Sequence, residues 1–216
     1  MEYKDIRQQV IDASLHSQKI GLIRGTSGNI SLRSDDGKVI AITPSGIPYE
    51  LLKPEDVPLV DENGSVLEGT TTPSSETPMH TAVLRARADV KAVVHTHAKY
   101  CTLLSIMGQE LPVMTIPTIA YAPTPAPIVP FELPGSQSLG EAVVKGLGEK
   151  GNAVMMEYHG MLAVGATLDK AMACADYIEE AAELAYLLKL ATGEVVGIDM
   201  GRIQKMMEIL KSGRAL

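Results

Sequence analysis

Hydrophobic and polar positions follow two different periods along the chain, which predicts a mixture of helices and strands. A first helix is predicted over residues 2–20, where apolar residues recur at helical spacing until Gly21. A long helix is predicted over residues 168–192, with Thr167 as its cap and alanines along one face. Four shorter helices are predicted: from Ser75 as cap through Leu84, over residues 98–107, from Ser138 as cap through Leu147, and around residues 203–210.

Short runs rich in β-branched residues, bounded by turn residues, predict the strands. These runs lie at residues 30–32, 39–42, 59–60, 65–67, 90–94, 111–114, 153–156 and 161–164. The segment 117–134 is too rich in proline for long regular structure, and we expect an ordered loop at a site or a subunit contact. Because strands and helices are interleaved without strict alternation, the pattern favours an α/β fold whose sheet is largely antiparallel or mixed and is covered by helices.

Composition narrows the class of protein. A chain of 216 residues, 45% hydrophobic and 21% charged, can bury one core, and without repeats or a linker we expect a single domain over residues 1–216. The net charge of −7 argues against nucleic-acid and membrane partners. Cys101 and Cys174 lie in apolar surroundings, as free thiols of a cytoplasmic protein would. We expect neither a leader peptide nor a membrane span.

Two histidines close the strand-like run Val93-Val94-His95-Thr96-His97. Strand alternation places His95 and His97 on one face with Cα atoms about 6.5–7 Å apart, so both rings could bind one metal ion. Two histidines near a strand end can equally be ordinary hydrogen-bonded residues, so the pair alone leaves both interpretations open. His159, in a turn between two short strands, could complete an open three-histidine zinc site, and Glu76 could add a carboxylate or act as a base.

Several clusters of small polar residues could bind an anion such as phosphate. Gly28-Asn29 precede a strand and Ser45-Gly46 follow one, and such loops either cradle a phosphate through their backbone or are simple turns. Ser74-Ser75 stand at a helix start, where free N–H groups and the helix dipole favour an anion. Glu76 lies in that first turn, where its alternative role is to stabilise the dipole. His80 is expected to be structural or exposed.

Five motifs together resemble the class II aldolase/adducin family. They are Gly28-Asn29, Thr43-Pro44-Ser45-Gly46-Ile47-Pro48-Tyr49, Ser74-Ser75-Glu76, Val93-Val94-His95-Thr96-His97-Ala98 and Tyr158-His159-Gly160. They occur in the order and spacing of that family over nearly the whole chain, closest to its members that cleave fuculose phosphate. The resemblance implies an α/β/α sandwich assembled as a C4 homotetramer with active sites between adjacent subunits.

The resemblance also implies a reaction and the residues that perform it. One zinc ion per chain would lie on His95, His97 and His159, with Glu76 as acid/base and as a further ligand in the resting state. The substrate phosphate would lie on Gly28, Asn29, Ser45, Gly46, Ser74 and Ser75. The implied reaction cleaves a ketose 1-phosphate, of the L-fuculose, 5-deoxypentulose or 5-methylthioribulose 1-phosphate type, into dihydroxyacetone phosphate and a small aldehyde through an enediolate. Methylthioribulose-1-phosphate dehydratase, ribulose-phosphate 4-epimerase and a non-enzymatic adducin-head-like binding module are the alternatives.

The chain departs from the pattern where the fuculose-phosphate-cleaving members use tyrosines, one of them from a neighbouring subunit. Ile116 stands at the first tyrosine position, and the tail 211–216 has no tyrosine either. Tyr121, within the proline-rich segment, is the candidate substitute. The apolar side chains of that segment, Phe131 among them, favour an aldehyde end that is less polar than lactaldehyde.

Overall fold

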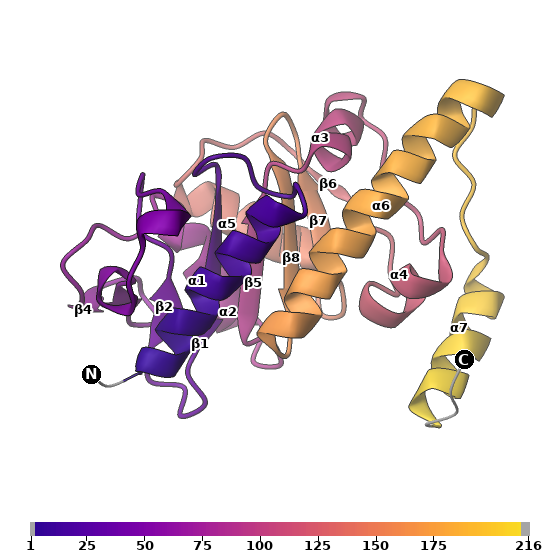
Figure 1. The fold of residues 1–216 in the computed structure, drawn as a ribbon. Helices are drawn as coiled ribbons and strands as arrows, with labels where there is room; N and C mark the ends of the chain where they lie inside the picture. The colour runs from indigo at the N-terminus through magenta and orange to yellow at the C-terminus, as the bar shows by residue number, and fades with distance from the viewer. Residues whose placement is uncertain (1–2, 213–216) are drawn as a thin grey trace.

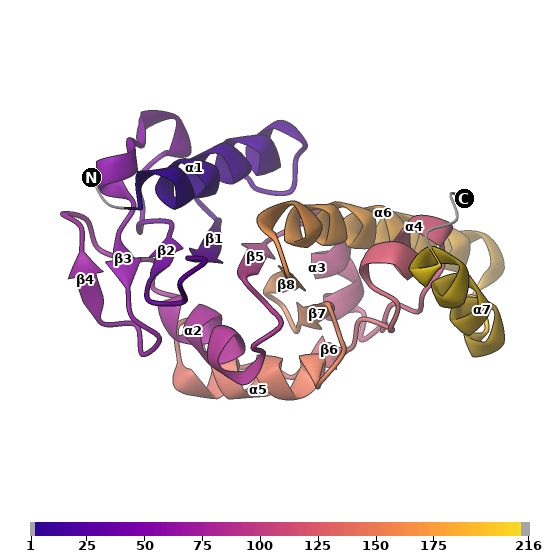
Figure 2. The same cartoon turned by 90° about the horizontal axis from the view of Figure 1, so that it is seen from below.

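The computed structural model describes residues 3–212, in which helices cover both faces of one eight-stranded sheet (Figures 1 and 2). Position 2 of the predicted first helix and positions 213–216 of the tail lie outside the described residues. The strands are β1 (Gly28–Arg33), β2 (Ile40–Ile42), β3 (Leu59–Val60), β4 (Val66–Glu68), β5 (Ala92–Thr96), β6 (Ile128–Val129), β7 (Ala153–Met156) and β8 (Gly160–Gly165).

The sheet has the order β4-β3-β2-β1-β5-β8-β7-β6. All neighbouring pairs are antiparallel except β6 and β7, which are parallel. This confirms the predicted α/β class with a largely antiparallel, mixed sheet. The helices are α1 (Lys4–Lys19), α2 (Thr77–Ala86), α3 (Lys99–Ile106), α4 (Ile116–Tyr121), α5 (Gln137–Leu147), α6 (Leu168–Thr192) and α7 (Met200–Lys211).

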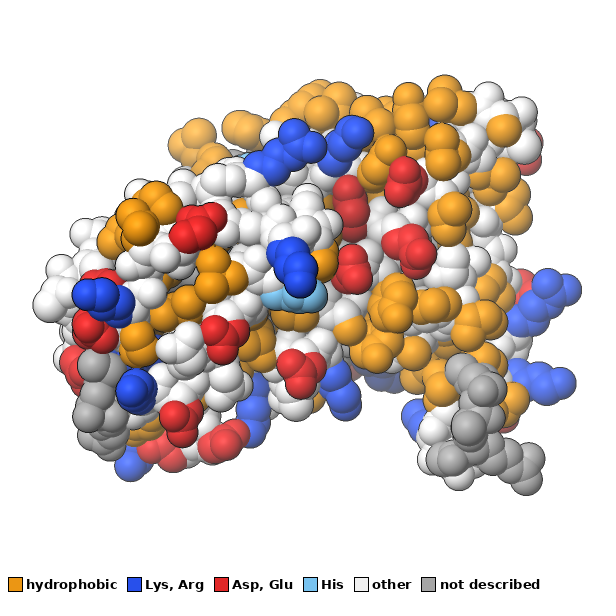
Figure 3. Space-filling model, viewed as in Figure 1, with side chains coloured by type: hydrophobic (Ala, Val, Ile, Leu, Met, Phe, Trp, Pro, Cys, Tyr) orange, Lys and Arg blue, Asp and Glu red, His pale blue; other side chains and the backbone are white. Residues whose placement is uncertain are grey.

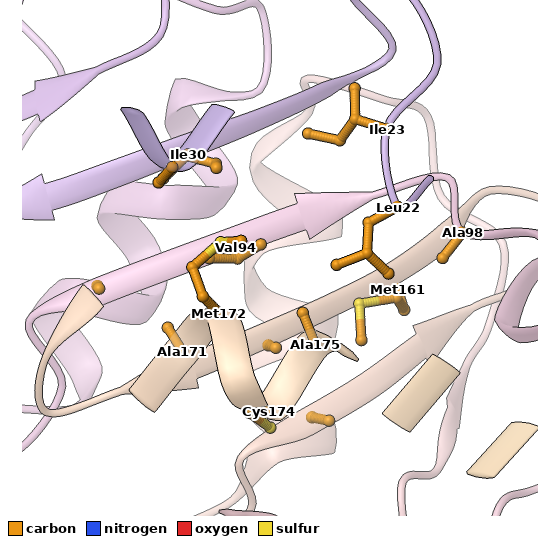
Figure 4. Packing of buried hydrophobic residues seen from close by; sticks show 14 of the residues in the cluster. Leu22, Ile23, Ile30, Val94, Ala98, Met161, Ala171, Met172, Cys174 and Ala175 are labelled. Atoms are coloured by element: carbon orange, nitrogen blue, oxygen red, sulfur yellow. The ribbon is translucent and has the colours of Figure 1, made fainter. Parts of the chain in front are cut away.

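Successive residues of the central strand β5 point into two different apolar layers, because side chains alternate along a strand. Val94 packs in the layer under α1 and α6, near Leu22 and Met172 (Figure 4). Val93 packs in the opposite layer, under α2 and α5. Figure 2 shows these two helix pairs on opposite sides of the sheet. The small side chains of Ala171, Ala175, Ala181, Ala182 and Ala185 are fully buried, which lets α6 lie close to the sheet.

The proline-rich segment is more regular than its composition predicts. It includes most of α4, because Pro117 stands in the first turn, where no N–H donor is needed, and Thr115 caps the helix. The predicted strand 111–114 does not form, and of its residues only Leu111 makes an isolated bridge, to Ala126. The prediction that Ser138 caps the next helix is wrong, because α5 begins at Gln137 with Ser136 as its cap.

The surface carries charged side chains of both signs and a band of exposed leucines. Leu184, Leu187 and Leu190 of α6 are 42%, 49% and 67% exposed. In Figure 3 hydrophobic side chains gather over the second half of this helix. Helix α7 lies at the edge of the molecule and packs on α4 through Ile203 (Figure 1). Within residues 3–212 no helix is both long and apolar enough to span a bilayer.

Candidate metal centre

The two histidines at the end of β5 face the same way, as strand alternation predicts. His95 is fully buried and His97, just beyond the last strand residue, is exposed. Their Nε2 atoms lie 3.2 Å apart. The predicted convergence of the two rings is therefore confirmed.

A tight turn between β7 and β8 brings the third histidine to the pair. The His159 ring centroid lies 4.8 Å from that of His95 and 4.9 Å from that of His97. Tyr158 adopts a φ of 58°, in the left-handed region, and the next residue but one, Gly160, has a φ of 157°. A Cβ at Gly160 would collide with the Thr96 carbonyl oxygen, so the missing side chain is what lets this turn approach β5.

Glu76 completes the cluster from the start of α2. Its Oε2 lies 3.0 Å from His95 Nε2, and its Oε1 lies 3.3 Å from His159 Nε2. One ligand atom from each of Glu76, His95, His97 and His159 falls within 4.8 Å of all the others. Residues from β5, the β7–β8 turn and α2 thus converge on one point, with a spacing that a single ion can bridge.

The hydrogen bonds around the cluster leave metal-binding lone pairs directed inwards. His95 Nδ1 lies 2.9 Å from the Met161 carbonyl oxygen and donates to it, which leaves Nε2 facing the cluster. Glu76 Oε1 is buried without a hydrogen-bond partner among the described residues. A cation would satisfy this oxygen. Three imidazole nitrogens and one carboxylate suit zinc and similar divalent transition metals, so the residues fit such an ion.

The protonation states also suit metal binding. Burial raises the pKa of the Glu76 carboxyl, but its contacts with His95, Asn29 and His159 outweigh this effect, so its pKa is lowered overall. Although part of the His97 side chain is exposed, desolvation of its ring beside the cluster and the neighbouring His95 and His159 lower its pKa to about 4. Burial and His95 lower the pKa of His159 as well. At neutral pH these groups are a carboxylate and neutral rings, the forms that bind metals.

Gly28 and Asn29 lie directly beside the cluster, at the start of β1. Gly28 pairs with Thr96 and Asn29 with His95 across the sheet. Asn29 Nδ2 donates to Glu76 Oε2 at 2.9 Å. Gly28 is fixed by the Tyr49 hydroxyl, which donates to its carbonyl oxygen at 2.5 Å. The first predicted phosphate-binding pair thus adjoins the acid/base candidate.

The two other predicted phosphate loops are tied to each other. Ser45 N donates to the Thr72 carbonyl oxygen at 2.9 Å, and Ser74 N donates to the Thr43 carbonyl oxygen at 3.0 Å. Ser45, Gly46 and Ser75 are exposed, whereas Ser74 is buried. These side-by-side loops meet the start of α2, where free N–H groups attract anions.

The start of α2 differs in detail from the prediction. Glu76, not Ser75, is the N-cap residue. The Ser74 hydroxyl accepts the Glu76 N–H at 3.2 Å. Ser74 thereby fixes the backbone of the carboxylate residue, and Ser75 keeps its side chain exposed to solvent.

Tyr121 lies apart from the cluster within one chain. It belongs to α4 and stacks on Tyr177 of α6, with ring centroids 5.3 Å apart. Ile116, at the start of the same helix, is 49% exposed. If Tyr121 acts at a metal centre, it must be the centre of a neighbouring subunit, as the family resemblance implied.

Two residues that support the site were not identified from the sequence. His80 is fully buried and contacts Asn29 and Ser31. Its position four residues after Glu76, on the same helix face, is the signal that could have found it. Glu179 of α6 accepts the backbone N–H groups of Tyr100 and Cys101 in the first turn of α3, at 2.8 and 2.9 Å. No local pattern marks that contact, since it joins residues almost 80 positions apart.

Known proteins resemble this chain over most of its length. Residues 8–186 match the class II aldolase and adducin N-terminal domain. The sequence is 37% identical over 198 residues to the L-fuculose phosphate aldolase of Escherichia coli K12, covering 92% of this chain and 90% of that protein. It is 33% identical over 208 residues to the 5-methylthioribulose-1-phosphate/5-deoxyribulose-1-phosphate aldolase of Rhodospirillum rubrum, covering 96% and 91%. A solved structure of an L-fuculose 1-phosphate aldolase superposes with a TM-score of 0.90 at 31% identity, covering 98% of each chain.

Proposed function

The chain belongs to the class II aldolase and adducin family, and on this premise we propose that it cleaves a ketose 1-phosphate into dihydroxyacetone phosphate and a small aldehyde. The relatives that it matches over nearly their full length are aldolases, so its activity is that of a class II aldolase, a carbon–carbon lyase. The convergence of Glu76, His95, His97 and His159 within 4.8 Å supports this most directly. A binding module of the adducin kind would not need all four groups.

His95, His97 and His159 would hold one divalent metal ion per chain, which we propose to be zinc. When bound, such an ion supplies electrostatic stabilisation of the negative charge that develops on the enediolate oxygens as the C3–C4 bond of the ketose breaks. His95 is held for this task by its bond to the Met161 carbonyl oxygen. The buried position of His95 excludes water from one side of the site.

Glu76 would move the proton. Its lowered pKa keeps it ionised, so the carboxylate can remove a proton from the three-carbon fragment in the synthetic direction and return it to carbon after cleavage. Its Oε1 has no hydrogen-bond partner among residues 3–212, which leaves that oxygen available for the transfer. In the resting state the same carboxylate would lie on the metal ion.

The loops beside Glu76 would bind the substrate phosphate. Gly28 and Asn29, Ser45 and Gly46, and Ser74 and Ser75 together offer backbone N–H groups, hydroxyls and an amide at the N-terminal end of α2. Binding energy from this remote group positions the reacting bond over the metal centre.

The loop after β6 would contact the aldehyde end of the substrate. Phe131 is 54% exposed. Its N–H donates to Glu157 Oε2 at 3.0 Å, which ties this loop to the turn that carries His159. An exposed phenyl ring there favours a 5-deoxypentulose or 5-methylthioribulose 1-phosphate over a substrate with a hydroxylated end.

We further propose that the chain is one domain over residues 1–216 and works as a C4 homotetramer in the cytoplasm. The exposed leucines of α6 support an interface between copies, and Tyr121 of a neighbouring subunit would serve as the additional acid. Both cysteines are free and buried, as expected in a reducing compartment. We expect no nucleic-acid or membrane partner.

The test is a direct assay of the carbon–carbon bond. Zinc-loaded protein is incubated with L-fuculose, 5-deoxyribulose and 5-methylthioribulose 1-phosphates, and dihydroxyacetone phosphate is followed by coupled reduction. Release of dihydroxyacetone phosphate that stops after chelation and returns with zinc supports the proposal. Mass spectrometry identifies the other outcomes: loss of water indicates a dehydratase, and an isomer of unchanged mass indicates an epimerase. No dihydroxyacetone phosphate from any substrate, with or without added zinc, overturns the proposal.

A further inference from the structure

A buried series of side-chain hydrogen bonds leads from the sheet to the acid/base candidate. Ser31 Oγ lies 2.7 Å from His80 Nδ1, and His80 Nε2 lies 2.5 Å from Asn29 Oδ1. Asn29 Nδ2 in turn lies 2.9 Å from Glu76 Oε2. Ser31, His80, Asn29 and Glu76 are 0%, 0%, 6% and 6% exposed, so water does not compete for these bonds.

The arrangement follows from two simple periodicities. Asn29 and Ser31 are two residues apart on β1 and therefore share a face of the sheet. Glu76 and His80 are four residues apart at the start of α2 and therefore share a face of the helix. When α2 packs on the sheet, the two pairs interlock, and each donor meets an acceptor.

Only one assignment of protons satisfies every bond. The Glu76 carboxylate can only accept, so the Asn29 amide nitrogen donates to it. Asn29 Oδ1 must then accept from His80 Nε2–H. Burial lowers the pKa of His80 to about 3, with a further contribution from His95, so the ring is neutral and has one N–H. Its other nitrogen, Nδ1, accepts from the Ser31 hydroxyl.

The opposite orientation of the amide is unfavourable. If the Asn29 side chain turned over, its oxygen would face the Glu76 carboxylate and its NH₂ group would face the N–H of His80. The ring of His80 could accept from that NH₂ group as its other tautomer, but the amide oxygen and the carboxylate would still be two buried acceptors that face each other without a bond. The carboxylate therefore sets which end of the amide faces it, and His80 Nε2–H holds the amide oxygen in that orientation.

We propose that His80, supported by Ser31, is a positioning residue that fixes the Asn29 amide as a hydrogen-bond donor toward the metal centre and thereby holds Glu76 in its metal-facing orientation. This inference rests on the proposed function in one respect. During proton transfer Glu76 must leave its resting position, and Asn29 Nδ2, still held by His80, then faces the site as a free donor for a substrate oxygen.

The inference is tested first with the metal alone, so that the readout needs no substrate. Co²⁺ affinity is measured by competition with a chelator on the metal-free full chain, and the Co²⁺ absorption spectrum reports whether a carboxylate is bound. His80→Phe removes both ring nitrogens and is expected to weaken Co²⁺ binding about 10-fold to 100-fold and to change the spectrum. His80→Gln, whose amide N–H can replace Nε2–H, is expected to stay within about twofold of the wild type.

A double-mutant cycle separates positioning from a general structural role. If His80 acts through Asn29, the double variant His80→Phe/Asn29→Ala binds Co²⁺ no more weakly than Asn29→Ala alone. Ser14→Ala is the matched control, because Ser14 is also a fully buried serine, but within residues 3–212 its hydroxyl bonds only to the Val10 carbonyl oxygen of its own helix. We expect that control to bind Co²⁺ as the wild type does.

Defined results overturn the inference. Unchanged Co²⁺ affinity in folded His80→Phe, or losses that add up in the double variant, would show that His80 does not act through Asn29. If His80→Phe does not fold, the cycle is run with Ser31→Ala, whose effect must likewise vanish in the Asn29→Ala background. This outcome is independent of the proposed reaction. If the wild type shows no aldolase activity but the double-mutant cycle is non-additive, the proposed reaction is rejected and the positioning role of His80 stands.

Discussion

Replacing Gly160 with alanine tests how the turn between β7 and β8 builds the metal centre. A Cβ at this position would lie 3.1 Å from His97 Cα. It would lie much closer to the Thr96 carbonyl oxygen, well under 3.0 Å, and real Cβ atoms essentially never show contacts that short. Both atoms belong to the backbone at the end of β5, so the clash cannot be relieved by moving a flexible side chain. The turn or the strand must shift by at least about half an ångström.

That shift would displace two of the candidate metal ligands, His95 and His159, at once. His159 directly precedes Gly160, and Met161, which fixes the His95 ring, directly follows it. Displacing ligands and their supporting bonds costs about 10-fold to 100-fold in metal affinity. The clash and the positive φ together cost about 1–3 kcal/mol of unfolding free energy. For a chain of this size that corresponds to a fall in Tm of about 2–4 °C for each kcal/mol.

The assay combines chelator competition for zinc with thermal unfolding of the metal-free protein. Gly193→Ala is the matched control: Gly193 also has a positive φ, of 81°, but a Cβ there meets nothing within 4 Å. We expect the control to lose some stability and to keep its zinc affinity. A Gly160→Ala protein that is folded and binds zinc as tightly as the wild type would refute the reasoning, because the turn would then not need the glycine to place His159.

Three further predictions concern single side chains. Glu76→Gln should still bind zinc and substrate but turn over more slowly by orders of magnitude, measured as kcat and KM for the preferred ketose 1-phosphate; unchanged kcat would remove Glu76 from its role. For His80, burial lowers the pKa from 6.5 to about 3, so below pH 6.5 the unfolded chain binds one proton more than the folded chain. The His80 contribution to the unfolding free energy of the metal-free protein should therefore fall with decreasing pH by up to about 1.4 kcal/mol per pH unit, and His80→Gln should show a shallower slope in urea unfolding between pH 6.5 and 4; equal slopes would contradict this. Glu179→Gln should lose about 1 kcal/mol of unfolding free energy, because a charged acceptor leaves the first turn of α3, whereas the neighbouring, exposed Glu180→Gln should lose none.

Short-range rules indicate which of the candidate metal ligands can face a common point, but not whether all of them do. Strand alternation places His95 and His97 on one face, and a turn between two strands leaves His159 free to face the same point. Whether His159 does so depends on β8 lying next to β5, a pairing that no local pattern encodes. The family resemblance supplied that information, and the geometry confirmed it.

The misses have equally physical causes. The proline content of residues 117–134 suggested irregular structure, yet Pro117 falls in the first turn of a helix, where its missing N–H removes no helical hydrogen bond. The apolar run 111–114 has the composition of a strand, but of its residues only Leu111 found a bridging partner. His80 gave no signal by itself, because its role depends on Asn29 and Ser31, which are about 50 residues away in sequence and meet it only in the packed core.

The register of β5 also determines when the metal site can exist. One edge of this strand is bound to β1, where Gly28 opposes Thr96, and the other to β8, where His95 opposes Leu162. Such pairings between distant parts of a chain form slowly during folding. On the ribosome, Glu76, His95 and His97 emerge before His159, which lies more than 60 residues further along the chain. The four groups of the candidate metal centre can therefore meet only after β8 has been synthesised and has paired with β5.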